Sequence, residues 1–351
     1  MCLWCPSVCR VCSGLRLRSV RSLQFAGVVL SARKFCAGSV QPERCCRAKT
    51  RAPNDAPCQR WVWDVLGCRA PLLRVRLVSR CPRTVVRPAA WACWVIERQV
   101  TVLEGRVIIV TGAGSGIGRE TARLIAANQA RGVVVVDRDS AAAASTVDLI
   151  VGAGGNAVAH IADLTEPDAA DTMIEQALLT YGSLDGAVNN AAVSPPPVEI
   201  EHCSDEQWAN VLDLNLTGVF RCLRAQIRAM SGRSGGSIVN ISSAAALRST
   251  PGLAPYTVSK TGVIALTHIG ATETGPRGIR INAVCPGRTE TPMMRSYLER
   301  EAVDVAEFVS EIPLRRLAQP DEISEAIVWL LSERSSYVNG EVLVVDGGRS
   351  V

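Results

Sequence analysis

A glycine-rich turn between a β-branched run and an amphipathic stretch constrains the fold of this chain more than any other feature. Residues 107–111 have the sequence Val-Ile-Ile-Val-Thr, which predicts a short buried strand. The amphipathic residues 119–128 predict a helix that begins directly after the turn. Glycine allows the main chain to turn sharply and to approach a bound group closely. The turn contains four glycines: Gly112, Gly114, Gly116 and Gly118.

A strand, a glycine turn and a helix in this order predict a dinucleotide-binding site. The first N–H groups of the helix have no partner within it, and with the positive end of the helix dipole they attract phosphate groups. The glycines allow a pyrophosphate to lie against the main chain. A glycine pattern alone is weak, and a plain structural turn is the alternative. The flanking strand and helix make us favour the dinucleotide site.

The next expected strand ends in an acidic residue that bears on cofactor choice. Residues 133–136 are four consecutive valines, which predict a strand buried on both faces, as in a parallel sheet. Asp137 follows, 19 residues after Gly118. An acid at this place accepts hydrogen bonds from the ribose of NAD and disfavours the 2′-phosphate of NADP. We expect NAD to be preferred, and NADP stays open because the neighbouring Arg138 can bind a phosphate.

The rest of residues 101–351 alternates between strand and helix patterns. Such alternation predicts an α/β fold in a single domain, with a doubly wound parallel sheet of the Rossmann type. Ligands bind these sheets at the carboxyl ends of the strands, where the pattern places Asp137, Asp163 and Asn190. The further expected strands are residues 157–161, 184–188 and 237–243, and the expected helices are residues 119–130, 140–151, 167–181, 204–230, 256–272 and 321–331.

A tyrosine and a lysine are spaced for proton transfer. Tyr256 and Lys260 are four residues apart at the start of an expected helix, so their side chains share one face. A phenol with its ordinary pKa of about 10 is a poor base at neutral pH, and a nearby ammonium lowers that pKa. Tyr256 is therefore a candidate general acid/base. The pair follows a strand that ends in Ser242 and Ser243, which distinguishes it from an ordinary helix-surface pair.

Residues 1–100 differ in composition from the remainder. They contain 18 Lys and Arg against 4 Asp and Glu, whereas residues 101–351 contain 20 against 29. They also hold 11 of the 14 cysteines and lack sustained periodicity, which predicts a poorly structured basic extension. We favour translation from a start codon placed too early. Two alternatives stay open: a mitochondrial targeting segment, since residues 1–40 contain arginine and no acid, and a metal or partner site at Cys2, Cys5, Cys9 and Cys12.

The composition also limits the partners. No run reaches the ~18 to 20 uninterrupted apolar residues that a membrane helix needs. The basic first part carries no nucleic-acid-binding motif. We therefore expect a small-molecule partner, no membrane, no nucleic acid, no bound metal, and a cytoplasmic location.

Six short segments follow one another in a fixed order along residues 104–351. Residues 111–118 form the glycine turn, residues 189–192 are Asn-Asn-Ala-Ala, and residues 238–243 end in the two serines. Tyr256 and Lys260 come next, followed by the segments at residues 282–292 and 345–348. In this order they resemble the motifs of the short-chain dehydrogenase/reductase family. The similarity is to its branch of 3-oxoacyl-carrier-protein reductases and glucose 1-dehydrogenases.

The resemblance implies a Ser–Tyr–Lys–Asn tetrad. Ser243, 13 residues before Tyr256, would bind the substrate oxygen, and Tyr256 would exchange a proton with it. Lys260 would lower the pKa of the tyrosine and bind the nicotinamide ribose, and Asn215 would hold a water in a proton relay. The resemblance also implies a homodimer or homotetramer. The implied cofactor-binding residues, besides Tyr256 and Lys260, are Gly112, Ser115, Gly116, Ile117, Gly118, Asp137, Arg138, Asp163, Leu164, Asn190, Ala191, Pro286, Gly287, Thr289 and Thr291.

Two rival functions compete with an oxidoreductase. Residues 232–236, Gly-Arg-Ser-Gly-Gly, match the nucleophile pattern of hydrolases, but here a helix precedes and a strand follows, which reverses the order that this turn needs. A non-catalytic NAD-binding protein is the more serious alternative, because a fold alone does not determine function. The presence of Ser243, Tyr256 and Lys260 favours an NAD(P)-dependent enzyme that interconverts a secondary alcohol and a ketone. The substrate itself stays open.

Overall fold

The chain divides into two compact units, Met1–Arg98 and Gln99–Val351, and each is described by itself. The computed structural model describes residues 23–25, 28–30, 75–77, 94–96, 102–232 and 235–351. In the first unit, β1 (Leu23–Phe25) pairs antiparallel with β2 (Val28–Leu30), and β3 (Val75–Leu77) pairs antiparallel with β4 (Trp94–Ile96). The four closely spaced cysteines, and all of the alternative targeting segment 1–40 except residues 23–25 and 28–30, lie outside the described residues. The domain boundary near residue 100 stays a prediction.

The second unit contains a seven-stranded parallel sheet with the strand order β11-β10-β9-β8-β5-β6-β7. The order reverses at β5, which pairs with β6 on one side and with β8 on the other. The predicted doubly wound α/β fold is therefore confirmed, and β5 marks the switch point where such sheets bind ligands. The strands are β5 (Val107–Thr111), β6 (Gly132–Asp137), β7 (Ala157–Ile161), β8 (Gly186–Asn189), β9 (Gly236–Ile241), β10 (Ile279–Pro286) and β11 (Val342–Val345).

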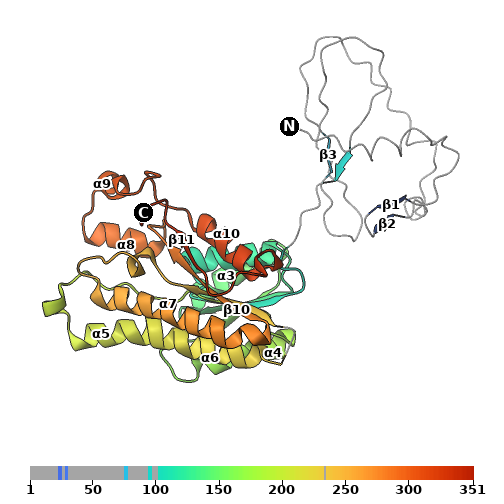
Figure 1. Ribbon diagram of the computed structural model, residues 1–351, viewed down its shortest axis with the longest axis horizontal. Helices are drawn as coiled ribbons and strands as arrows, with labels where there is room; N and C mark the ends of the chain where they lie inside the picture. The colour runs from blue at the N-terminus through green and yellow to red at the C-terminus, as the bar shows by residue number, and fades with distance from the viewer. Residues whose placement is uncertain (1–22, 26–27, 31–74, 78–93, 97–101, 233–234) are drawn as a thin grey trace, which may run out of the picture. The chain divides into compact units, whose positions relative to one another are not determined.

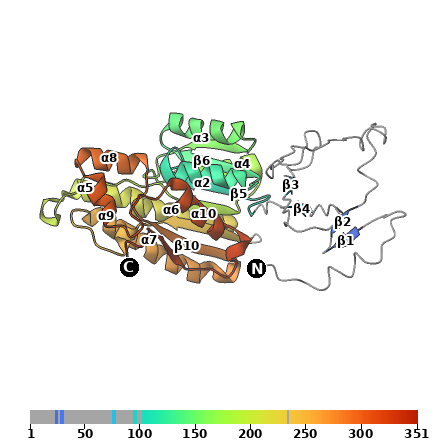
Figure 2. The same ribbon diagram turned by 90° about the horizontal axis from the view of Figure 1, so that it is seen from above.

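Helices cover both faces of this sheet (Figures 1 and 2). On one face α2 packs against α3 and α10, and on the other α6 packs against α4 and α7. No helix in residues 102–232 and 235–351 is both long and apolar enough to cross a bilayer. The helices are α2 (Gly116–Ala127), α3 (Ser140–Gly152), α4 (Ala169–Tyr181), α5 (Asp205–Leu212), α6 (Val219–Met230), α7 (Ala254–Thr274), α8 (Pro292–Arg300), α9 (Val305–Ser310) and α10 (Pro320–Leu331).

The valine run explains why two cores form. Successive side chains of a strand point to opposite faces, so a run of apolar residues serves both. Val134 and Val136 belong to the hydrophobic cluster under α4 and α6, whereas Val133 and Val135 belong to the cluster under α2 and α10. The four side chains are at most 1% exposed, as the sequence predicts for a central parallel strand.

Several expected bounds differ from the structure: α2 begins at Gly116, α7 begins at Ala254, and β9 ends at Ile241, before the two serines. Two further expected helices differ in their course. The helix expected from residue 167 begins at Ala169, because residues 163–168 form a turn in which the Glu166 N–H bonds the Asp163 carbonyl oxygen at 3.0 Å. The helix expected over residues 204–230 is divided by a π-helical segment, Asp213–Gly218. Its start is confirmed, since the Ser204 hydroxyl accepts a hydrogen bond from the Gln207 N–H at 3.1 Å. The π-helical segment affects the site, because it contains Asn215.

Candidate active site

A cavity of about 430 Å³ lies at the carboxyl ends of the strands in the second unit. All but two of the residues expected to form the site line it, and the exceptions are Gly118 and Asn215. The lining residues that the sequence predicted are Gly112, Ser115, Gly116, Ile117, Asp137, Arg138, Asp163, Leu164, Asn190, Ala191, Ser243, Tyr256, Lys260, Pro286, Gly287, Thr289 and Thr291. These residues are spread over 180 positions of sequence, so the parallel sheet is what brings them together.

The glycine turn presents bare main chain to the cavity. Gly112 and Gly116 have φ angles of +62° and +53°, a region that favours glycine. A Cβ atom on Gly112 would lie 2.8 Å from the Ala191 Cα atom, so no side chain fits there. The Ser115 side chain makes no capping hydrogen bond at the start of α2. The turn therefore offers a helix N-terminus and a hydroxyl at the place where a pyrophosphate is expected.

Gly118 does not line the cavity, so its expected contact with the cofactor stays a prediction. It lies behind the turn, where a Cβ atom would collide with the Gly112 carbonyl oxygen and the Asn190 side chain. The reason for glycine at this position is the close packing of α2 against its own turn. Sequence spacing alone does not separate this packing role from ligand contact.

Asp137 fastens β6 to the glycine turn. Its Oδ2 atom accepts a hydrogen bond from the Gly114 N–H at 2.8 Å, and its Oδ1 atom accepts one from the Asp139 N–H at 3.1 Å. Each carboxylate oxygen has a second lone pair, so the group retains capacity for ribose hydroxyls. The exposed Arg138 lines the same cavity. The residues present therefore fit the adenosine end of a dinucleotide.

Asn190 and Thr111 join the end of β8 to the glycine turn. The Asn190 side-chain amide donates to the main-chain oxygens of Thr111 at 3.0 Å and Gly112 at 3.1 Å. The buried Thr111 hydroxyl accepts hydrogen bonds from the N–H groups of Asn190 and Ala191 at 3.0 and 3.2 Å. The side chains of both residues are engaged within the protein, which leaves the main chain of residues 190–191 to face the cavity.

Asp163 lies beyond β7 at the outer end of the cavity. Its Oδ1 atom accepts hydrogen bonds from the Thr165 N–H at 3.0 Å and the Thr165 hydroxyl at 2.8 Å. These two bonds, with a smaller contribution from Arg138, hold the pKa of the Asp163 carboxyl below its ordinary value. Asp163 therefore carries a negative charge at neutral pH.

Ser243, Tyr256 and Lys260 meet at the inner end of the cavity. Tyr256 lies in the first turn of α7, and the Ser243 side chain acts on its phenol and lowers its pKa. The Ser243 hydroxyl also accepts a hydrogen bond from the Ala245 N–H at 3.1 Å. Ser242 has another role, since its hydroxyl donates to the Lys260 carbonyl oxygen at 2.8 Å. The two serines thus differ: the Ser243 side chain acts on the phenol, and Ser242 supports α7.

The expected acidification of Tyr256 by Lys260 is not present in the protein alone. Burial raises the pKa of the Tyr256 phenol above its ordinary value, and the Ser243 hydrogen bond offsets this only in part. Burial also lowers the pKa of the Lys260 ammonium, to about 8. The physical reason is desolvation, which disfavours the charged form of each group. The Lys260 Nζ atom donates to the Ile241 carbonyl oxygen at 2.9 Å.

Asn215 lies outside the cavity lining and acts on a neighbouring loop. Its Oδ1 atom accepts from the Val193 N–H and its Nδ2 atom donates to the Val193 carbonyl oxygen, both at 2.9 Å. A longer bond of 3.4 Å reaches the Ser259 hydroxyl. Asn215 is completely buried, so this pairing holds the loop after β8 against α7. No local pattern in the sequence indicates the contact with Val193.

Sequence reasoning missed three arginines that line the cavity. Arg288 follows β10, Arg300 ends α8, and Arg349 follows β11. A possible signal for Arg288 is its place directly after the Pro286-Gly287 pair, but nothing in the sequence joins it to the C-terminal Arg349.

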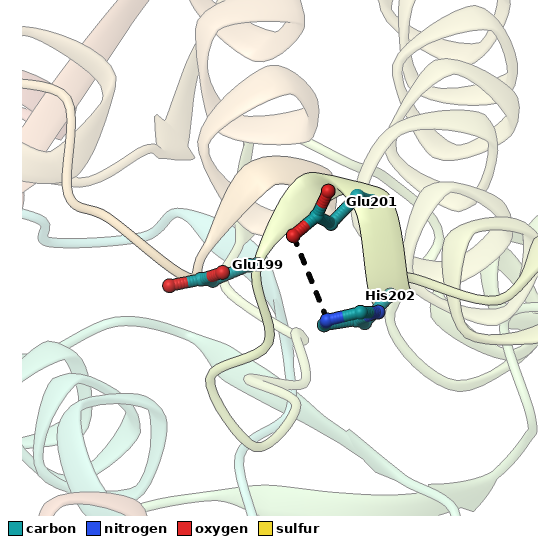
Figure 3. A group of neighbouring side chains, drawn as sticks. All are labelled: Glu199, Glu201 and His202. Carbon is teal, nitrogen blue, oxygen red and sulfur yellow. Dashed lines mark ion pairs between the residues drawn. The ribbon is translucent and has the colours of Figure 1, made fainter.

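One group of side chains elsewhere has the composition of a metal site. The ligand atoms of Glu199, Glu201 and His202 all lie within 4.8 Å of one another, and Figure 3 shows the three side chains on one short segment. Glu201 and His202 form an ion pair at 3.6 Å. All three residues are exposed and none lines the cavity. We assign no metal to this group.

The chain is similar to known oxidoreductases over the whole second unit. A family model described as enoyl-(acyl carrier protein) reductase matches residues 112–350. A 2,5-dichloro-2,5-cyclohexadiene-1,4-diol dehydrogenase of Sphingobium indicum is 38% identical over 248 residues, which are 70% of this chain and 97% of that protein. A cyclohexanol dehydrogenase of an Acinetobacter species is 40% identical over 242 residues, which are 69% of this chain and 94% of that protein. The crystal structure of levodione reductase has a TM-score of 0.69 at 30% identity and covers 71% of this chain and 98% of its own.

The chain therefore belongs to the short-chain dehydrogenase/reductase family. It is an oxidoreductase that interconverts a secondary alcohol and a ketone with a nicotinamide cofactor. The alternative of a non-catalytic binding protein finds no support among these relatives.

Proposed function

We propose that Tyr256 is the general acid/base of this reaction. In the oxidation direction, Ser243 binds the substrate oxygen and Tyr256 accepts the hydroxyl proton while the hydride leaves the carbon that bears the oxygen. Bound NAD or NADP supplies the hydride acceptor. In the reduction direction Tyr256 returns the proton to the carbonyl oxygen. The observation that carries this assignment is that Ser243, Tyr256 and Lys260 line one cavity, where the Ser243 side chain acts on the Tyr256 phenol.

Lys260 and Asn215 have supporting roles in this proposal. The Lys260 ammonium is within the same cavity and has donors left for the nicotinamide ribose, since one of them bonds the Ile241 carbonyl oxygen. Asn215 keeps the Val193 loop in place. Its participation in a water relay remains part of the proposal, supported by its position beside Ser259 on α7.

NAD is our proposed cofactor over NADP. The glycine turn and the start of α2 would hold the pyrophosphate, and Asp137 would accept the ribose hydroxyls. A second negative charge nearby, Asp163, adds to the repulsion of a 2′-phosphate. Thr289 and Thr291 would contact the nicotinamide end, because both line the cavity after β10.

We further propose a cyclic secondary alcohol with an apolar carbon skeleton as the substrate and oxidation as the direction. Support comes from the apolar lining residues Met293, Met294, Tyr297 and Phe308, and from the cyclic alcohols named for the relatives. A homodimer or homotetramer and a cytoplasmic location are proposed from the family alone.

The test uses the full-length protein and its Tyr256→Phe variant with cyclohexanol and either NAD or NADP. Loss of the general acid/base is expected to lower kcat by about 100-fold or more while NAD binding is retained. Tyr337→Phe is the matched control, because Tyr337 is fully exposed. Undiminished turnover by Tyr256→Phe would reject the assignment. NAD binding without turnover of cyclohexanol or of other secondary alcohols would favour a non-catalytic protein.

A further inference from the structure

Two arginines that follow neighbouring strands meet at one wall of the cavity. Arg288 comes after β10 and Arg349 after β11, and both line the cavity that contains Tyr256. Their side chains are 13% and 14% exposed, so both guanidinium groups are largely removed from bulk water. The C-terminus lies near α9 in both views (Figures 1 and 2). In agreement, Arg349 donates a hydrogen bond to Glu311, which directly follows α9.

A single carboxylate serves both arginines. The Glu311 Oε2 atom lies 2.7 Å from an Arg288 nitrogen and 3.0 Å from an Arg349 nitrogen. Asp346 is a second carboxylate in this region: it lies three residues before Arg349, and its Oδ2 atom is buried without a hydrogen-bond partner among the described residues. Burial and the nearby charge of Arg349 lower the pKa of the Arg288 guanidinium. The two guanidinium groups thus lie close together and share the Glu311 carboxylate as their ion-pair partner.

Arg349 also has a donor without an acceptor. Its Nε atom is buried and has no hydrogen-bond partner among the residues that the structure describes. Buried donors in native proteins are nearly always paired, and an acceptor such as a ligand, a water or an ion is one explanation for an exception. Arg288 is held more completely: it donates to the Phe308 carbonyl oxygen and to Glu311, and its guanidinium lies 3.5 Å from the centre of the Phe308 ring.

The position of Arg288 and Arg349 in the fold excludes the adenosine end of the cofactor as their ligand. β10 and β11 form one edge of the sheet, whereas β6 and β7, which carry Asp137 and lead to Asp163, form the other. The arginines instead lie beyond Gly287, beside strand β10, against which the Tyr256 helix α7 packs. They are thus on the side of the cavity where the alcohol or ketone is expected.

We propose that the substrate of this enzyme carries a carboxylate and that Arg349, supported by Arg288, binds it. This inference rests on the proposed function, because Tyr256 would contact the hydroxyl or keto group of the same molecule. A guanidinium binds a carboxylate through two parallel hydrogen bonds, which would use the Nε donor of Arg349. The apolar side chains of Met294, Tyr297 and Phe308 would cover the carbon skeleton between the two polar ends.

The test compares two ligands of nearly equal shape, cyclohexanecarboxylate and cyclohexanecarboxamide, by calorimetric titration of the full-length protein with and without NAD. The carboxylate is expected to bind about 10-fold or more tightly, the usual effect of a charged hydrogen-bonded pair. Arg349→Gln should abolish this preference while the carboxamide still binds, which shows that the variant is folded. Arg349→Lys should retain part of it, since the charge remains without the bidentate geometry.

Arg228→Gln is the control, because Arg228 is exposed on α6 and does not line the cavity. Equal affinity for the two ligands, binding of neither, or a preference that persists in Arg349→Gln would overturn the proposal. The Tyr256→Phe variant separates this outcome from failure of the proposed function. It is expected to keep the preference for the carboxylate although it loses turnover.

Discussion

The Lys260 ammonium lies 5.9 Å from the centre of the Tyr256 ring and bonds the Ile241 carbonyl oxygen at 2.9 Å. The lysine is thus tied to strand β9 rather than to the phenol oxygen. Both groups are desolvated, and burial shifts their pKa values in opposite directions, upward for Tyr256 and downward for Lys260. In the protein alone, burial therefore shifts each group towards its uncharged form, although a Lys260 pKa of about 8 still leaves the ammonium as the main form at pH 7.

The stability of the protein should depend on pH through Lys260. Its folded pKa of about 8 is below the value of about 10.4 for an unfolded chain, so the unfolded chain binds more protons between these values. The cost of burying the ammonium, roughly 3 kcal/mol, is present below pH 8 and is relieved as pH rises towards 10. Denaturant titrations should show the free energy of unfolding of the wild type rising relative to Lys260→Met over this range. A constant difference would contradict the lowered pKa.

The oxidation rate should rise towards alkaline pH. Tyr256 must be in its phenolate form to accept the proton of the alcohol. Its raised pKa means that this form is scarce at pH 7. The pH profile of kcat/KM for oxidation is expected to climb above neutrality, and that for reduction to fall. A profile for oxidation that is highest at acidic pH would exclude Tyr256 as the base.

Substitution of Ser243 should mainly lower activity, whereas substitution of Ser242 should mainly lower stability. Ser243→Ala is expected to lower kcat by about 100-fold, because a hydrogen bond to the reacting oxygen is lost. Ser242→Ala removes the bond to the Lys260 carbonyl oxygen and should reduce the free energy of unfolding by about 1 kcal/mol while most activity remains. Steady-state kinetics and chemical unfolding of both variants check this. The reverse pattern would show that the two roles are exchanged.

Asp137 should govern the choice between NAD and NADP. Asp137→Ser removes the negative charge, so the ratio of kcat/KM values for NAD over NADP is expected to fall by about 10-fold or more. Asp139→Ser is the control: serine still caps α3, where Asp139 accepts from the N–H groups of Ala141 and Ala142. A ratio that is unchanged in Asp137→Ser would assign the choice to Arg138.

An alanine substitution at Gly118 tests whether this glycine is needed for the packing of α2, and the same substitution at Gly152 is the control. Gly118→Ala forces a methyl group against the Gly112 carbonyl oxygen, which should destabilise the fold by about 1 to 3 kcal/mol and weaken NAD binding. Gly152 is the last residue of α3, and a Cβ atom there would meet no neighbour. Gly152→Ala should therefore be neutral or stabilising by up to about 1 kcal/mol. Thermal unfolding with and without NAD measures both effects. A tolerated Gly118→Ala would mean that α2 can move away from its turn.

Much of the fold could be predicted because its signals are local. The valine run before Asp137 and the strand-turn-helix order around Gly112 depend on residues within a few positions of one another. The π-helical segment at Asn215 could not be predicted from the sequence, since the bonds between Asn215 and Val193 join residues 22 positions apart. Gly118 was expected at the cofactor for the same reason: spacing identifies the turn but not which of its faces is open.

The amino-acid sequence by itself determined the parallel α/β sheet, the family, and the residues Ser243, Tyr256 and Lys260 that gather at its edge. The sheet and the Tyr256–Lys260 pair follow from periodicity and spacing along the chain, whereas the family and the role of Ser243 follow from the resemblance of the motifs. Only the tertiary structure decided the direction in which the pKa of Tyr256 shifts and the close approach of Arg288 and Arg349. Both depend on burial and on charges contributed by distant segments, because electrostatic energies are set by separation in space and by access to water.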